Sequence, residues 1–239
     1  MIGQDYPKIE WQFAGLDLLE PNALIGDLIL FSTALFLAAK IKTNYPQNDF
    51  YSNWRRFYLV FGWSFLFGGF GHLLYNYSGL WGKYPSWLLG MVATYFLTKG
   101  MLSLWPNVKQ KEIFEKSALL LLGIGFTLEL LVFWRVDLSF DQSKGLFIPT
   151  LISGIGLFFS LVIVGIRYQR QIHSGYRFLW IAALLLLPSG LIQNKKINLH
   201  QWFDRNDFSH VLLLISLVLY FTALQKTKEA NSILENRIL

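Results

Sequence analysis

Long apolar runs separated by short polar segments dominate this sequence. A helix that crosses a membrane needs ~20 mostly apolar residues, and seven runs have about that length. We therefore predict membrane-spanning helices at about 22–41, 57–77, 85–105, 117–134, 146–166, 176–194 and 207–226. Ahead of the first span, residues 11–19 are expected to lie along the membrane surface as a short amphipathic segment.

The charged residues between the spans predict which way the helices run. Lysine and arginine gather after the first, third and fifth predicted spans and in the tail, where they are Lys40, Lys42, Arg55, Arg56, Lys109, Lys111, Lys116, Arg167, Arg170, Arg177, Lys226, Lys228 and Arg237. Short loops rich in these residues stay in the cytoplasm. We therefore expect a multi-pass protein of the cell membrane with its N-terminus outside and its C-terminus in the cytoplasm.

The tryptophans fit this layout. Trp54 and Trp202 are among those near predicted span ends, where an indole ring can be buried while its N–H stays wet at the headgroup level. Trp63 and Trp180 fall deeper within their spans and are expected to pack between helices.

Composition supports a single membrane domain. Hydrophobic residues make up 54% of the chain and charged residues only 15%, against roughly 25% charge in soluble domains. We therefore predict one all-α domain over residues 1–239, a seven-helix membrane bundle. The net charge of +6 lies in short clusters between spans, which indicates orientation and not nucleic-acid binding. The absence of cysteine excludes disulfides, thiolate metal sites and cysteine nucleophiles.

Polar side chains gather in the outer half of the predicted bundle. Near the start of the last span, Asn206, Asp207 and His210 share one helix face because residues three and four apart are neighbours. His72 lies near the outer end of the second span, after several glycines that allow close helix contact. The same depth includes Asp27, Glu129, Ser189 and Gln193. We therefore expect a polar pocket near the outer membrane surface.

Two carboxyl groups in this outer half have alternative interpretations. An ionisable group inside the hydrocarbon region usually faces the bundle interior or a wet cavity. Glu129 is either a proton carrier or pocket ligand, or a carboxyl that pairs with Arg135 near the interface. Asp27 is either a catalytic group or a helix-start residue favoured by the helix dipole.

The histidines suggest a metal site. Zinc in a catalytic site takes three protein ligands and a water molecule, and His72, His210 and Asp207 would supply that number. Asp207 and His210 have the i, i+3 spacing used in helical carboxylate and histidine metal sites. Possible additional residues are His200 in the preceding loop, Asn206, and Ser64, which lies on roughly the same helix face as His72.

The seven spans, the histidine at the outer end of the second span and the polar entrance to the seventh span resemble the superfamily of alkaline ceramidases, progestin and adiponectin receptors and Per1-like proteins. This resemblance implies a zinc ion held by one histidine of helix two and two histidines of helix seven, and amide hydrolysis of lipids. His72 and His210 match two of these positions. Asn206 stands in place of the third histidine, and Gly68 in place of a nearby serine.

Three functions remain open on this basis. The first is a zinc-dependent hydrolase of lipid amides or esters, with Glu129 or Asp27 as general acid or base. The second is a module that binds or senses a lipid or small amphiphile without turnover. The third is a proton-coupled transporter that uses Glu129 and Asp27. Membrane lipid is the expected partner in each case, as environment and as possible substrate or ligand.

Overall fold

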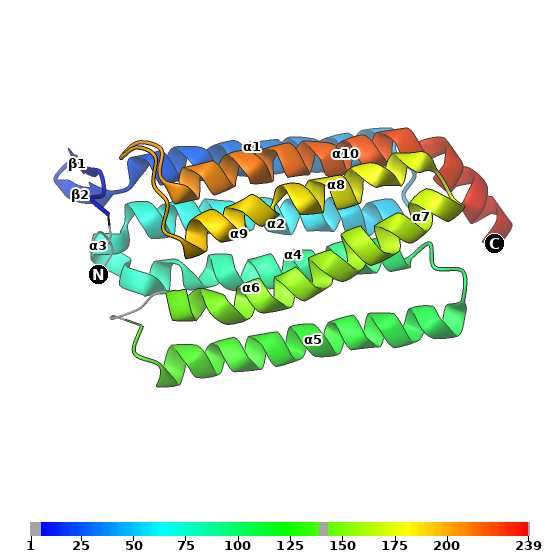
Figure 1. Cartoon of the computed structure of the whole chain (residues 1–239), viewed down its shortest axis with the longest axis horizontal. Helices are drawn as coiled ribbons and strands as arrows, with labels where there is room; N and C mark the ends of the chain where they lie inside the picture. Colours follow the sequence, from blue (N-terminus) through cyan, green and yellow to red (C-terminus); the bar gives the residue numbers. More distant parts are fainter. Residues whose placement is uncertain (1–5, 139–142, 239) are drawn as a thin grey trace.

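The computed structural model describes residues 6–138 and 143–238, and within these residues the chain is helical apart from one small hairpin. The elements are β1 (Glu10–Phe13), β2 (Leu16–Leu19), α1 (Pro21–Asn44), α2 (Asp49–Leu73), α3 (Tyr75–Ser78), η1 (Gly79–Gly82), α4 (Tyr84–Leu102), α5 (Val108–Arg135), α6 (Ser143–Leu157), η2 (Phe158–Val164), α7 (Gly165–Gln171), η3 (Ser174–Tyr176), α8 (Arg177–Leu185), α9 (Leu187–Asn194) and α10 (Arg205–Ile238). The long helices lie side by side, with the hairpin at one end of the molecule and the end of α10 at the other (Figure 1). The predicted all-α class is confirmed.

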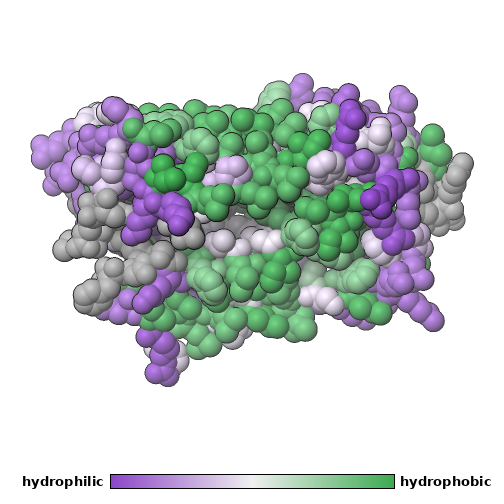
Figure 2. Space-filling model, viewed as in Figure 1, coloured by the Kyte–Doolittle hydropathy of each residue, from purple (hydrophilic) through white to green (hydrophobic). Residues whose placement is uncertain are grey.

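Several helices are suited to a membrane. Five are long and apolar enough to cross one, and they cover Pro21–Asn44, Val108–Arg135, Lys144–Gln171, Ser174–Gln193 and Arg205–Ile233. Asp49–Leu73 and Tyr75–Leu102 reach this hydropathy only as a pair, which bends by 82° at the break, so the number rises to six if the pair is one span. On the face shown in Figure 2, hydrophobic residues cover the middle and hydrophilic residues gather at both ends. The number seven and the orientation stay predictions.

Side-chain caps explain where several helices begin. Asn48 accepts a hydrogen bond from the Tyr51 backbone N–H and so starts α2 at Asp49, well before the predicted residue 57. Asn107 caps α5 in the same way through the Gln110 N–H. Both caps satisfy backbone groups that the first turn of a helix leaves unpaired. These helices are therefore longer than their apolar runs.

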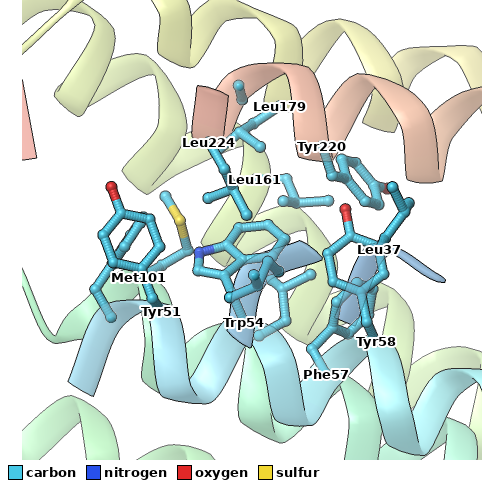
Figure 3. Packing of buried hydrophobic residues seen from close by; sticks show 14 of the residues in the cluster. Leu37, Tyr51, Trp54, Phe57, Tyr58, Met101, Leu161, Leu179, Tyr220 and Leu224 are labelled. Atoms are coloured by element: carbon cyan, nitrogen blue, oxygen red, sulfur yellow. The ribbon is translucent and has the colours of Figure 1, made fainter. Parts of the chain in front are cut away.

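The core is an aromatic cluster along α2. Trp54 is fully buried, and its ring lies 5.7 Å from that of Phe57 and 6.2 Å from that of Tyr220 on α10 (Figure 3). The expectation that the Trp54 N–H stays wet is wrong, because Trp54 packs inside the bundle and its Nε1 is buried without a hydrogen-bond partner among the described residues. Trp63, which was expected to pack between helices, is 46% exposed, although its ring edge contacts Phe31.

The N-terminal segment forms a hairpin instead of the amphipathic surface segment expected for residues 11–19. β1 and β2 pair antiparallel, with Phe13 opposite Leu16. Ala14 and Gly15 both have positive φ angles, as the tight turns that match strand twist require. The Asp17 N–H donates to the Tyr77 hydroxyl at 2.8 Å, which holds the hairpin against α3 at the end of the bundle.

Candidate functional site

Buried acidic and basic side chains gather at the hairpin end of the bundle. Glu20, Asp27, Lys83, Asp204 and Asp207 are all buried. They come from the start of α1, the residue before α4 and the start of α10, segments that lie far apart in the sequence. A buried charge is costly unless it is paired and hydrogen-bonded, so the partners of these groups define what the site can do.

Lys8 bridges the first and last helices. Its Nζ atom lies 2.6 Å from Glu20 Oε1 and 2.6 Å from Asp204 Oδ2. Burial opposes the charge of Lys8, yet Glu20 and Asp204 together raise the pKa of its ammonium group above the usual value. Lys8 therefore stays charged and ties the residue before α1 to the residue before α10.

Glu20 is held from two sides. Its Oε2 atom lies 2.6 Å from His72 Nδ1, and Lys83 Nζ lies 3.3 Å from that same ring nitrogen. Burial alone would raise the pKa of the Glu20 carboxyl, but His72, Lys83 and Lys8 lower it well below the usual value. The backbone of Glu20 is left-handed, with φ 52° and ψ 53°, a conformation uncommon outside glycine.

Asp204 and Asp207 cap α10 reciprocally. Asp204 Oδ1 accepts from the Asn206 N–H at 2.7 Å, and Asp207 Oδ2 accepts from the Asp204 N–H at 2.9 Å. This is the arrangement of a capping box, in which two side chains satisfy the free amides of the first turn. Asp207 Oδ2 also accepts a hydrogen bond of 2.8 Å from the Asn22 side chain, which joins α10 to α1.

His210 lies deeper, against α1. Its Nε2 atom is 3.3 Å from Asp27 Oδ1, and its Nδ1 atom is buried without a hydrogen-bond partner in the described residues. A Cβ atom added at Gly26 would lie 2.7 Å from His210 Nδ1, and one added at Gly69 would lie 2.9 Å from Asp27 Cβ. The two glycines therefore make room for the histidine and its carboxylate partner.

A cleft of about 260 Å³ lies between α1 and α10 beside His210. Its lining consists of Asn22, Ile25, Gly26, Ile29, Leu30, Trp202, Phe203, Asp207, His210, Val211 and Leu214. The polar groups belong to Asn22, Asp207 and His210, whereas most of the wall is apolar. Ile25, Ile29 and Val211 are about half exposed, so the cleft is open on the outer surface of the helix pair.

The predicted zinc ligands do not converge. His72 contacts Glu20, His210 contacts Asp27, and Asp207 accepts from Asn22 and Asp204. Over 6–138 and 143–238, no three histidine, aspartate or glutamate side chains form a group that could hold a metal ion. The residues as arranged here do not fit the three-ligand zinc site that the resemblance implies.

Glu129 lies apart from this cluster, where α5 packs against α4 and α6. The residue is fully buried, and neither carboxyl oxygen has a hydrogen-bond partner among the residues that the structure describes. The alternative pairing with Arg135 is wrong, since the Arg135 guanidinium lies 4.0 Å from the centre of the Trp134 ring. Glu129 and Asp27 are therefore not two halves of one site.

The additional candidates have local structural partners. The Ser64 hydroxyl donates to the Ser86 carbonyl at 3.0 Å, and Asn206 Oδ1 accepts from Gln193 Nε2 at 3.0 Å. His200 is exposed and accepts from the Trp202 backbone N–H at 3.1 Å. None of these three side chains lines the cleft.

Sequence reasoning missed several residues of the site. Lys8, Glu20 and Asp204 form its ion-pair network, and Asn22 and Phe203 line its cleft. Two signals in the sequence could have found part of this set. Glu20 directly precedes the proline that begins α1, and Asp204 stands three residues before Asp207, the spacing of a capping box.

Known proteins give little further guidance. No curated protein and no solved structure matches the chain. A family model described as a family of unknown function (DUF6962) matches residues 23–229. The match includes His72, His210, Glu129 and every residue of the cleft lining except Asn22, but not Lys8 or Glu20. The chain therefore belongs to the family of unknown function DUF6962.

Proposed function

We propose that this chain is a seven-span integral membrane protein of the cell membrane whose α1/α10 cleft binds a lipid or small amphiphile, with no turnover required. The main support for this proposal is that the cleft has both a polar and an apolar part in its lining. Asn22, Asp207 and His210 supply polar groups, whereas Ile29 and Leu214 are among the residues that make the remaining wall apolar.

The membrane part of the proposal is supported by helix length and charge. α2 has 25 residues and α4 has 19, which correspond to about 37 and 28 Å at 1.5 Å per residue. A hydrocarbon core is about 30 Å thick, so each of these helices can cross it separately despite lower hydropathy. The lysine and arginine clusters favour an orientation in which the hairpin end, with the cleft, faces the outer side.

The shape of the cleft favours a single-chain amphiphile. Drug-sized ligands occupy pockets of about 300–1,000 Å³, and this cleft is smaller, at about 260 Å³. Its half-exposed residues Ile25, Ile29 and Val211 would face lipid, so a ligand would enter sideways from the bilayer. The apolar chain would lie along these residues while the head meets Asp207 and His210.

Photo-crosslinking tests this function directly. A single-chain amphiphile with a photoreactive group in its alkyl chain is added to the protein in nanodiscs, and the labelled peptides are identified by mass spectrometry. We expect label within residues 22–30 and 202–214. Ile29→Trp should fill the cleft and abolish this label, whereas Leu28→Trp is the matched control, because Leu28 is exposed on the same helix but does not line the cleft.

Two results would contradict the proposal. One is label spread evenly over all lipid-facing helices, which would indicate ordinary bilayer contact. The other is unchanged label in the Ile29→Trp variant. Preferential label in residues 91–122 and 152–159 would instead point to the separate apolar cavity of about 200 Å³ between α4, α5 and α6.

A further inference from the structure

One polar group of the cleft lining is the carboxylate of Asp207, and this determines which headgroup the cleft suits if the proposed amphiphile binding is correct. Asp207 uses Oδ2 for the Asn22 amide and the Asp204 N–H, while its Oδ1 has no hydrogen bond in the part of the chain that the structure describes. His210 also lines the cleft, with Nε2 3.3 Å from Asp27 Oδ1 and Nδ1 buried against Gly26.

Acidic side chains outnumber basic ones around the cleft, which favours a positively charged headgroup. Within residues 6–138 and 143–238, no lysine or arginine lines the cleft, and the ammonium group of Lys8 nearby already pairs with Glu20 and Asp204. Four buried acids lie at this end of the bundle, Glu20, Asp27, Asp204 and Asp207, together with two lysines, the partly buried Lys8 and the buried Lys83. The acids stay in excess even when Arg205, the first residue of α10, is counted with the lysines.

The start of α10 does not provide an anion site. A helix N-terminus carries a partial positive charge and free N–H groups that favour anions. Here Asp204 accepts from the Asn206 N–H, and Asp207 adds a second carboxylate in the same turn. An anionic headgroup would therefore meet two carboxylates.

Two aromatic rings complete the wall. Trp202 and Phe203 both line the cleft, and Trp202 is more than half exposed. The face of an aromatic ring attracts cations, and tryptophan does so most strongly. A carboxylate beside an aromatic ring is the pair of groups that recognises an amine cation.

The geometry points to an amphiphile whose head is a positively charged amine and whose single alkyl chain lies between α1 and α10. The ammonium group donates to Asp207 Oδ1 and lies against Trp202. The chain lies along Ile25, Ile29, Val211 and Leu214. The head carries no phosphate, because no lysine or arginine among the described residues lines the cleft to meet one.

Competition among three probes that share a ten-carbon alkyl chain and differ in headgroup tests this inference. Decylammonium, decanol and decyl sulfate, each below its micelle concentration, compete with the photoreactive amphiphile for the cleft. We expect decylammonium to compete at least about tenfold better than the other two, a difference of ~1.4 kcal/mol. Trp202→Leu should weaken decylammonium severalfold and leave decanol unchanged.

Asp207→Asn separates charge from structure. Asparagine keeps an acceptor oxygen for Asn22 and the Asp204 N–H, so the cap can persist while the charge is lost. We expect decylammonium to bind at least about tenfold more weakly and decanol to bind as before. Asp17→Asn is the matched control, because Asp17 is an exposed acid of the hairpin that does not line the cleft.

The outcomes distinguish the two proposals. If none of the three probes competes, the cleft does not bind amphiphiles and the proposed function is wrong. If all three compete equally, the cleft binds amphiphiles and only the headgroup inference fails. Stronger competition by decyl sulfate, or an equal loss for decylammonium in Asp17→Asn, also overturns the headgroup inference.

Discussion

His210 Nε2 lies 3.3 Å from Asp27 Oδ1, so a histidine near the start of α10 meets a buried carboxylate of α1. The contact lies beside the cleft and depends on close packing. Gly26 leaves space for the imidazole ring, and Gly69 leaves space for Asp27. The position of the first helix against the last therefore determines the shape of the proposed binding site.

Gly26→Ala should disturb the cleft without removing any polar group. The new Cβ would lie 2.7 Å from His210 Nδ1, so the ring or α1 has to shift. We expect amphiphile binding to fall at least about tenfold and the melting temperature in detergent to decrease. Gly123→Ala is the control, since no atom lies within 4 Å of a Cβ added there. Equal binding by the wild-type protein and Gly26→Ala would show that the close contact is unimportant.

Glu20→Gln should destabilise the protein strongly. The change leaves the buried ammonium group of Lys8 with one carboxylate partner and removes the charge beside His72. Removing one partner of a buried ion pair costs about 3–5 kcal/mol. Thermal unfolding in detergent should show a large decrease in melting temperature. Glu10→Gln on β1, an exposed position, should leave the melting temperature within error, and a similar small effect for Glu20→Gln would contradict the network.

Stability should be greatest over a broad pH range set by this network. The lowered pKa of Glu20 means that its contribution is complete above about pH 4.5 and is lost as the pH falls through the folded-state pKa. The raised pKa of Lys8 means that its contribution is complete below about pH 10.5 and is lost as the pH rises through the folded-state pKa. Melting temperatures measured across this range test both limits. In Glu20→Gln, the melting temperature should fall less at low pH than it does in the wild-type protein. An unchanged fall would argue against this role of Glu20.

Glu129→Leu should not lower stability or amphiphile binding. The carboxyl is fully buried and has no hydrogen-bond partner among the described residues, so an apolar side chain of similar size removes a desolvation cost of about 1–3 kcal/mol. We expect an equal or higher melting temperature and unchanged crosslinking in the cleft. The matched variant Glu129→Gln keeps a polar side chain and should not raise the melting temperature. Loss of proton-coupled flux in proteoliposomes with Glu129→Leu would instead support the transporter alternative.

Much of the helical architecture could be predicted from the sequence because apolar runs of membrane length are a strong local signal. The helix starts were less predictable. α2 begins at Asp49 through an Asn48 cap that lies well outside the apolar run, and this early start buries Trp54. The hairpin of residues 10–19 was missed because it is held in place by a tertiary contact, the hydrogen bond from the Asp17 N–H to Tyr77.

The candidate site was predicted in part. The sequence singled out Asp27, Asp207 and His210 as candidates for one polar pocket, and Asp207 and His210 do line one cleft, beside Asp27. It could not indicate that Lys8 reaches Asp204, since the two residues are 196 positions apart. The pairing of His72 with Glu20 likewise depends on how the helices pack, and periodicity along one helix carries no information about that.

A crystal structure of the protein with a bromodecyl ammonium ligand tests the amphiphile site most directly, because the bromine atom gives an anomalous peak that locates the chain. We expect a peak between α1 and α10, beside Ile29 and Leu214, with the amine next to Asp207. A peak confined to the cavity between α4, α5 and α6, or to the annular lipid around the helices, would contradict it.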